Sequence, residues 1–415
     1  MSDNIIMWIS GPEQSVPARS GSFRQAPIKL RRTAEYRRSC FGPRRHIFSI
    51  IREHGEIMKR KGTESRYTGV IKKAILTEAL LVLLAAGAVV RQTAEVNSAS
   101  VEKDYIKWVD FNVPYEALCD AYGWDVDSHE GAHPVDWVEL LAYAAARSGG
   151  EFDKNALKTL NKAGEELMQG ETTMEKLTKD LKYYPYYKEA YGAVLGGMVG
   201  EYEEEQEDES GRKTYRTVYG LKAFFPLAKG FDFTHYDDFG AGRSFGYKRK
   251  HLGHDMMGQI GTPIIAIESG RVEALGWNQY GGWRIGIRSL DGKRYYYYAH
   301  LRQNYPYAEN LEEGSLVTAG DVIGYMGHTG YSTTENVNNI EVTHLHWGME
   351  LVFDESQKES DNEIWIDVYP LTRFLSRHRQ ETVKVEGTKE WVRTLGIRDP
   401  EMESVSAQKK GDNGG

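Results

Sequence analysis

Two histidines lie two residues apart in THLHWGMEL, residues 343–351, a stretch that otherwise has the pattern of a buried strand. Side chains alternate faces along a strand, so His344 and His346 would share one face with Gly348 and Glu350. The other face would be apolar and typical of a core, with Leu345, Trp347, Met349 and Leu351. The sequence therefore predicts two neighbouring imidazoles on the non-core face, with Gly348 leaving room in front of them.

A further histidine and a carboxylate occur in HLGHD, residues 251–255. Gly253 allows the backbone to turn, so that the side chains of His251 and Asp255 can converge. Taken alone, this spacing is equally typical of a solvated loop. Joined to the strand histidines, it completes a His, Asp and His set. A catalytic zinc needs three such N and O ligands and a fourth position open to water. One strand histidine can then bind the metal while its neighbour faces the water.

The tyrosine-rich stretch YYYYAHL, residues 295–301, also ends near a histidine. Strand alternation predicts that Tyr296, Tyr298 and His300 share one face. A histidine at the end of a hairpin strand is more often incidental than catalytic. The predicted metal site nearby is what makes His300 a candidate.

Four stretches together resemble a known family. HLGHD, YAHL, VTAGDVIGYMGHTGYST (317–333) and HLHW occur in the order and at the intervals found in the lysostaphin-type, or LytM-like, zinc endopeptidases. The resemblance covers roughly residues 217–352. It implies one zinc ion per chain, with the ligands His251, Asp255 and His346. It also implies that His300 and His344 position the water and stabilise the developing oxyanion, and which of them takes the proton stays open.

The resemblance implies an enzyme, a zinc metalloendopeptidase that hydrolyses peptide bonds in bacterial peptidoglycan, in stem peptides or cross-bridges. Bound zinc lowers the pKa of its water to about 7, and a histidine suits proton transfer at neutral pH because its ordinary pKa is about 6.5. Extended peptides need a groove. We expect its floor to be formed by GGW at 281–283 with the Tyr-rich strand, which includes Tyr296 and Tyr298.

The sequence departs from the family pattern just before HLHW. TTENVNNIEV, residues 333–342, is inserted there, Thr343 replaces a proline and Trp347 replaces a phenylalanine. We expect the insertion to form a loop beside the cleft that alters substrate choice or covers the site. His254 and His328 match no family position and are predicted to be loop residues near the groove.

Three alternatives to a peptidoglycan hydrolase stay open. The first is a catalytically silent cell-wall binding or scaffold protein, although such relatives typically lose a ligand or a catalytic histidine and this chain keeps all five. The second is an enzyme kept latent by the helical region or by residues 333–342. The third is a peptidase that acts on a protein, such as a Gly-rich segment.

The remaining sequence predicts an α+β chain that positions this site. Residues 101–204 have helical periodicity and form a small all-helical domain whose partners are unknown. Residues 205–216, within the charge run EYEEEQEDESGRK at 201–213, predict a solvated acidic linker. Residues 217–377, with many short strands and Gly turns, form a mainly antiparallel β peptidase domain. Residues 378–415 form a tail whose end, from Arg398, is expected to be disordered.

The N-terminal part has a different character. Residues 1–73 carry 16 Lys and Arg against 6 Asp and Glu, a net of +10, so the net charge of −8 leaves −18 for the rest. An acidic body of this kind excludes nucleic acid as its partner. The apolar stretch at 74–90, flanked by basic residues, predicts a transmembrane or signal helix, and a buried core helix is the alternative. Met58 opens an ordinary basic leader, so residues 1–57 are predicted to be a mis-called extension.

A basic leader before an apolar segment predicts the orientation of the chain. Basic residues stay on the cytoplasmic side, which places the β domain outside the cell membrane. The chain would be anchored as a single-pass protein through residues 74–90, or secreted if the helix is cleaved. Only Cys40 and Cys119 are present, too few for a disulfide framework.

Overall fold

The computed structural model describes residues 105–245, 247–358 and 360–402. The segments predicted at 1–73 and 74–90 therefore lie outside the described residues, as do residues 403–415. Within the described ranges, none of the helices combines the length and apolar character that crossing a membrane requires.

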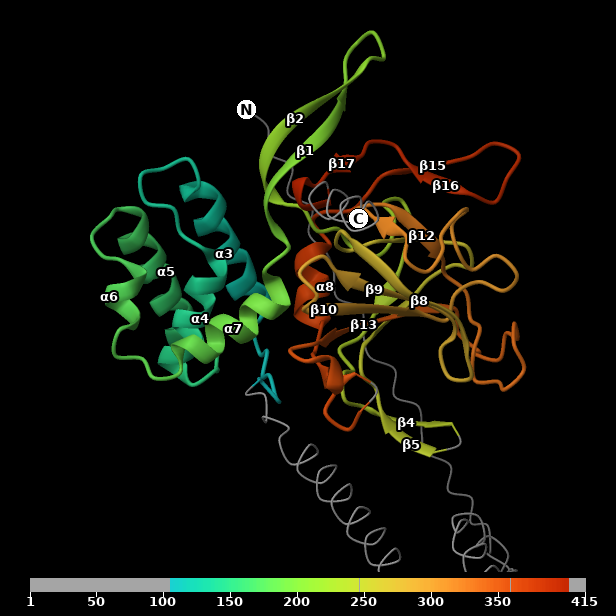
Figure 1. Ribbon diagram of the computed structural model, residues 1–415, viewed down its shortest axis with the longest axis horizontal. Helices are drawn as coiled ribbons and strands as arrows, with labels where there is room; N and C mark the ends of the chain where they lie inside the picture. Colours follow the sequence, from blue (N-terminus) through green and yellow to red (C-terminus); the bar gives the residue numbers. More distant parts are fainter. Residues whose placement is uncertain (1–104, 246, 359, 403–415) are drawn as a thin grey trace, which may run out of the picture. The chain divides into compact units, whose positions relative to one another are not determined.

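The described chain begins with a helical region, as predicted. Its helices are α3 (Tyr115–Ser128), α4 (Trp137–Ser148), α5 (Lys154–Met168), α6 (Met174–Thr178) and α7 (Tyr184–Leu195), gathered in one bundle (Figure 1). The side chain of Asp136 accepts a hydrogen bond from the backbone N–H of Glu139 and so caps the start of α4. Gly149, with φ of 73°, ends the same helix in the left-handed conformation.

The helical region shares one hydrophobic core with the β region. The ring of Tyr122, on α3, packs edge-on against Phe374, on α8 (Tyr369–Leu375), with centroids 5.5 Å apart. The hydroxyl of Tyr219 donates to Asp125 Oδ1 at 2.7 Å. The two regions are therefore packed together by apolar and polar contacts.

The prediction of a solvated linker at 205–216 is wrong. The charge run forms the β hairpin of β1 (Val199–Glu207) and β2 (Lys213–Leu221), which projects as a long ribbon (Figure 1). Two acidic residues of β1 pair with basic residues of β2, in Glu204–Arg216 and Glu205–Lys213. Opposite charges across a pair of strands stabilise them, so composition alone misjudged the segment.

The predicted tail is also ordered through residue 402. Its strands are β15 (Thr382–Lys384), β16 (Trp391–Arg393) and β17 (Ile397–Arg398), and β17 pairs with β1. Just beyond it, the buried carboxylate of Asp399 accepts a hydrogen bond from Lys222 Nζ at 3.1 Å. The expectation of disorder from Arg398 is therefore wrong for residues 398–402, because a buried ion pair and a strand pairing hold them.

The β region is mainly antiparallel, as predicted, and is built on an eight-stranded sheet. Its order is β11 (Leu316–Val317), β8 (Gly270–Asn278), β9 (Gly282–Ser289), β10 (Arg294–Ala299), β13 (His344–Leu351), β6 (His254–Met257) and β3 (Thr234–His235), with β14 (Ile364–Trp365) on β13. Smaller pairs are β4 (Gly242–Phe245) with β5 (Tyr247–Lys250), and β7 (Pro263–Ile265) with β12 (Val322–Tyr325). A short 3₁₀ helix, η2 (Glu355–Gln357), follows β13.

Strand β13 has the two faces that its sequence predicts. Its apolar side chains are fully buried in the core: Leu345, Trp347, Met349 and Leu351. The other set, with His344 and His346, therefore faces away from the core.

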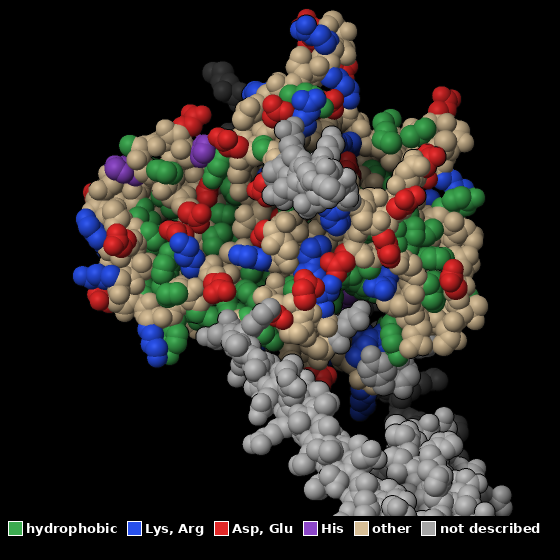
Figure 2. Space-filling model, viewed as in Figure 1, with side chains coloured by type: hydrophobic (Ala, Val, Ile, Leu, Met, Phe, Trp, Pro, Cys, Tyr) green, Lys and Arg blue, Asp and Glu red, His purple; other side chains and the backbone are tan. Residues whose placement is uncertain are grey.

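On the molecular face drawn in Figure 2, acidic and basic side chains are interspersed.

Candidate metal centre

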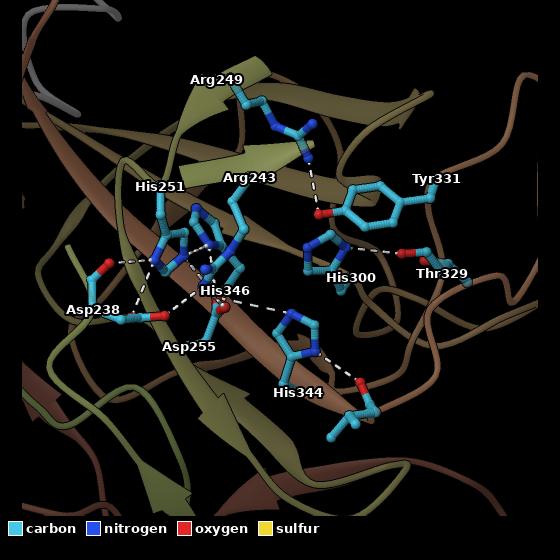
Figure 3. Close-up of polar contacts among 11 residues, drawn as sticks. Asp238, Arg243, Arg249, His251, Asp255, His300, Thr329, Tyr331, His344 and His346 are labelled. Atoms are coloured by element: carbon cyan, nitrogen blue, oxygen red, sulfur yellow. Dashed lines mark hydrogen bonds and ion pairs between the residues drawn. The ribbon is translucent and has the colours of Figure 1, made fainter. Parts of the chain in front are cut away.

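Strands β13 and β6 bring the three predicted ligands together. His346 lies directly opposite Asp255 in the pairing of these strands, with His346 Nδ1 2.9 Å from Asp255 Oδ1. His251 precedes β6, and its Nε2 lies 3.0 Å from both Asp255 Oδ1 and His346 Nδ1 (Figure 3). Residues 95 positions apart in the chain thus converge on one point.

The donor set fits a zinc ion. A tetrahedral ion with bonds of roughly 2.0–2.2 Å holds its ligands roughly 3.3–3.6 Å apart. The three donor atoms form a triangle of nearly equal edges, slightly smaller than this, so a cation entering it needs only a small outward shift. His251, Asp255 and His346 are also the one group of this kind found among the described residues.

Asp255 gives the site its negative charge. Burial opposes its ionisation, but hydrogen bonds from His251 and His346 outweigh burial and hold the pKa of this carboxyl well below its usual range. Burial also lowers the pKa of His346, which favours the neutral imidazole. An ionised carboxylate beside a neutral imidazole is the protonation state in which these groups bind a metal.

Gly253 is needed for a reason other than the predicted turn. A Cβ added there would lie 2.6 Å from the ring of His346 and 2.7 Å from the carbonyl oxygen of Trp347. Its φ is not in the left-handed region. The glycine therefore lets the backbone approach the ligand closely, and any side chain would push His346 aside.

Gly348 makes room for Trp365, and not for the two histidines as the sequence predicted. A Cβ there would meet the ring of Trp365 at 3.0 Å and the carbonyl oxygen of Leu252 at 2.8 Å. The space in front of this glycine is filled by Trp365, which lines the cleft. Gly348 thus makes room for an aromatic wall.

His300 and His344 lie beside the ligand set, with ring centroids 4.6 Å apart. The Nδ1–H of His300 donates to the carbonyl oxygen of Thr329 at 2.9 Å, and that of His344 donates to the carbonyl oxygen of Val342 at 2.8 Å. Carbonyl oxygens only accept, so these contacts place the proton of each neutral ring on Nδ1. The Nε2 atoms are left to accept, and that of His344 lies 3.8 Å from Asp255 Oδ1.

His300 reaches the cleft by leaving the strand pattern. Its φ is 61°, in the left-handed region, so the alternation of β10 ends there. Tyr296 and Tyr298 are fully buried in the core, whereas Tyr295 and Tyr297 line the cleft. The prediction that Tyr296, Tyr298 and His300 share a face is therefore wrong, and Tyr296 and Tyr298 form no part of a groove floor.

A cleft of about 570 Å³ opens over the site. Its lining includes the five predicted site residues, the arginines Arg243, Arg249 and Arg284, Gly281 of the GGW stretch, and the aromatic residues Tyr280, Tyr295, Tyr297, Tyr331 and Trp365. Burial lowers the pKa of His300, more so because His344 lies next to it. A neutral His300 imidazole, with His344 beside it, therefore faces a cleft large enough for several peptide residues.

The insertion at 333–342 does not cover the site. All ten of its residues are described, and none of them lines the cleft. Asn336 holds the loop by accepting from Trp283 Nε1 at 2.9 Å and donating to Asn304 Oδ1 at 2.6 Å. The insertion lies to one side, so the described residues give no support to latency through this loop.

The two unassigned histidines differ from one another. His328 follows β12, and its Nδ1–H donates to the carbonyl oxygen of Ile340 at 2.7 Å, as a loop residue would. His254 was predicted to be a loop residue but lies in β6, 1% exposed, with its ring 2.9 Å from Nδ1 of His235. Burial lowers the pKa of His254 to about 3. Its neighbour Asp255 points to the opposite face of the strand.

Two residues that the sequence analysis did not identify support the ligands. His251 Nδ1, on the side of the ring away from the metal position, lies 3.1 Å from Asp238 Oδ1 and 3.3 Å from the backbone carbonyl oxygen of Asp238. Arg243 donates to the carboxylate of Asp238 and, at 3.3 Å, to Asp255 Oδ2. Both lie in FTHYDDFGAGRSF, residues 233–245, where an Asp and an Arg have no spacing that distinguishes them from surface charges.

We expect Asp238→Asn to weaken zinc binding by about 10- to 100-fold, because carboxylates that orient a ligating histidine have effects of this size. Zinc affinity measured by competition with a chelator checks this. Asp237→Asn, at the exposed neighbouring carboxylate, is the matched control and should bind zinc normally. Equal affinity in both variants would mean that Asp238 does not orient His251.

Comparisons with known proteins agree with this geometry. The model of Peptidase family M23 matches residues 249–360, which include all five site residues. The L-Ala–D-Glu endopeptidase of Bacillus subtilis is 35% identical over 161 residues, covering 39% of this chain and 46% of that protein. Lysostaphin of Staphylococcus simulans is 40% identical over 89 residues, covering 21% of this chain and 17% of that protein.

Solved structures include the catalytic domain of lysostaphin from Staphylococcus simulans. It is 31% identical and covers 34% of this chain and 92% of that one, with a TM-score of 0.26. The chain spans less than half the length of either curated relative. Residues 249–360, which contain the converging His251, Asp255 and His346, therefore form a domain of peptidase family M23.

Proposed function

We propose that this chain is a zinc-dependent endopeptidase that hydrolyses peptide bonds in bacterial peptidoglycan. The convergence of His251, Asp255 and His346, with donor atoms 2.9–3.0 Å apart, is the observation that carries the proposal. The relatives described above as an L-Ala–D-Glu endopeptidase and as lysostaphin support the class of substrate.

The side chains of the site have two different roles in hydrolysis, metal binding and proton transfer. Zinc held by His251, Asp255 and His346 would lower the pKa of a water molecule and polarise the scissile carbonyl. His300 and His344 present Nε2 to the cleft, so either can accept a proton from the attacking water. The resulting imidazolium then donates a proton to the departing amine, which restores the neutral ring.

Arg249 is placed to bind the substrate backbone. Its guanidinium lies 5.0 Å from the ring centroid of Tyr280 and 5.1 Å from that of Tyr331, and it donates to the Tyr331 hydroxyl at 2.9 Å (Figure 3). A guanidinium held between two aromatic rings keeps a fixed position. It can donate to carbonyl oxygens of a peptide lying along the cleft.

The proposal includes the location of the enzyme and its division into parts. Residues 74–90 would anchor the chain in the cell membrane or be cleaved as a signal, with the basic residues 1–73 on the cytoplasmic side. Peptidoglycan lies outside that membrane, which is where residues 105–402 would then act. The helical region would belong to the same extracytoplasmic part.

Metal removal tests the proposed function. Purified chain incubated with peptidoglycan sacculi should release soluble fragments with new amino termini, and mass spectrometry would identify the cleaved bond. Chelation should stop the release, and one equivalent of zinc should restore it. Zinc binding without any release from sacculi would instead favour the silent wall-binding alternative.

A further inference from the structure

The cleft extends beyond the metal site to a second, acidic end. Glu350 lies on the same face of β13 as His346, four residues further along the strand, which is about 13 Å at 3.2–3.4 Å per residue. It lines the cleft and is only 4% exposed. Its Oε1 is buried and has no hydrogen-bond partner among the described residues. A buried carboxylate oxygen without a partner is costly unless a ligand supplies one.

The neighbouring carboxylates already have hydrogen-bond partners. Glu273, on β8, accepts from Arg288 Nε at 2.8 Å and also from Lys358. Glu363, before β14, accepts from Trp365 Nε1 at 2.8 Å. This end of the cleft has three carboxylates, those of Glu273, Glu350 and Glu363, near two cations, Lys358 and Arg288. The free oxygen of Glu350 therefore lies in a region with excess negative charge.

We propose that Glu350 forms a specificity site that binds a primary ammonium group of the substrate peptide. The site rests on the proposed function, because it selects among peptides cleaved at the metal centre. An extended peptide spans 3.3–3.6 Å per residue, so the ammonium would belong to a side chain roughly two to four residues from the scissile bond. In peptidoglycan stem peptides, the diamino acid provides such a group.

The walls between the two ends suit a peptide backbone. The ring of Tyr297 packs edge-on against His346, with centroids 5.9 Å apart, and against Trp365, at 6.1 Å. Both aromatic residues line the cleft. A peptide crossing from the metal site to Glu350 would thus lie over the surface formed by these two rings and end at a charge.

The protonation of Glu350 determines how the affinity of the site for an ammonium group changes with pH. Burial, and then the charge of Glu363, raise the pKa of Glu350 to about 7, while Arg288 and Lys358 oppose this. A bound ammonium favours the carboxylate, so affinity for it should rise as the pH increases from about 6 to 8. A lysine side chain stays charged over this range because its pKa is about 10.4.

Two peptides that differ in one charge test the site. They are L-Ala–γ-D-Glu–L-Lys–D-Ala and the same peptide with its lysine side chain acetylated, each given to the full chain with one equivalent of zinc. We expect the free amine to raise kcat/KM by about 10- to 100-fold, the range for a hydrogen bond to a charged group. Glu350→Gln should lose this preference and its rise with pH, while unfolding at the same temperature.

Glu355→Gln is the matched control, because Glu355 lies in the same acidic surroundings, pairs with Lys358 at 3.5 Å and does not line the cleft. It should keep the preference for the free amine. Equal cleavage of the two peptides by the unmodified chain, or an unchanged preference in Glu350→Gln, would overturn the proposal. A preference that falls with pH would show instead that protonated Glu350 donates to a carbonyl group.

Binding separates failure of this site from failure of the proposed function. Calorimetry with His344→Ala, which should hold zinc without cleaving, measures the affinity for the same two peptides. If the unmodified chain cleaves neither peptide but the free amine binds more tightly, the ammonium site stands and the proposed activity on this substrate fails. Equal binding of both peptides would reject the ammonium site.

Discussion

The His346→Ala variant should bind no zinc at micromolar concentrations and should release nothing from peptidoglycan beyond the rate of the zinc-free chain. His346 supplies one of the three donors found among the described residues, and its Nδ1 lies 2.9–3.0 Å from both of the others. With that ring removed, His251 and Asp255 would offer two ligands, too few for a catalytic zinc site. Metal analysis after dialysis, together with assays of soluble fragments, measures both losses.

The matched control for His346→Ala removes an imidazole elsewhere in the β region. His328→Ala leaves the three donors in place, because His328 contacts the carbonyl oxygen of Ile340. This variant should retain about one zinc per chain. Full zinc content in His346→Ala, in a chain that unfolds at its normal temperature, would contradict the ligand assignment and with it the proposed function.

Replacing His300 or His344 should separate zinc binding from catalysis. His344→Ala and His300→Asn should each retain about one zinc per chain, while kcat falls by about 10²- to 10⁴-fold, the contribution expected from a positioned proton acceptor. Asparagine is chosen for His300 because it tolerates the left-handed φ of 61° at this position. KM should change little, since neither Nε2 is needed to hold the peptide.

Zinc analysis and steady-state kinetics on the same preparations decide the roles of the two histidines. Loss of zinc in His344→Ala would make His344 a fourth ligand, which its distance of 3.8 Å from Asp255 Oδ1 argues against. If a variant keeps both zinc and full activity, the histidine that it lacks takes no part in the mechanism. The larger loss of kcat identifies the main proton acceptor.

The sequence predicted the shared face of the two strand histidines because side chains alternate along a strand. Alternation along β13 places His344 and His346 opposite the fully buried Leu345 and Trp347, and hydrophobic burial leaves no other register. Strand alternation gave a wrong prediction for the neighbouring strand, β10. His300 follows Ala299, the last residue of β10, and has a φ of 61°. The sequence YYYYAHL contains no glycine or other residue that predicts this change of backbone conformation.

Other parts were not predictable from the sequence because they depend on a distant partner. The acidic β1 forms a strand because β2 and β17 lie on either side of it, and residue Ile397 of β17 is almost 200 positions away. Asp238 supports a ligand only because the fold brings it 3.1 Å from His251 Nδ1. Tertiary contacts of this kind override composition, and a single sequence does not display them.

Arg294 determines how independent the catalytic region can be. It is fully buried, forms two hydrogen bonds of 2.8 Å with Glu268, and donates to the carbonyl oxygen of Ala193 at the end of α7, also at 2.8 Å. Cutting the chain between the helices and the sheet would open this guanidinium to water and strip a partner from β10, the strand that leads to His300. The helical region is therefore part of the scaffold that supports the catalytic strands. Exchanging it between relatives would require exchanging the residues that contact it, such as Arg294, as well.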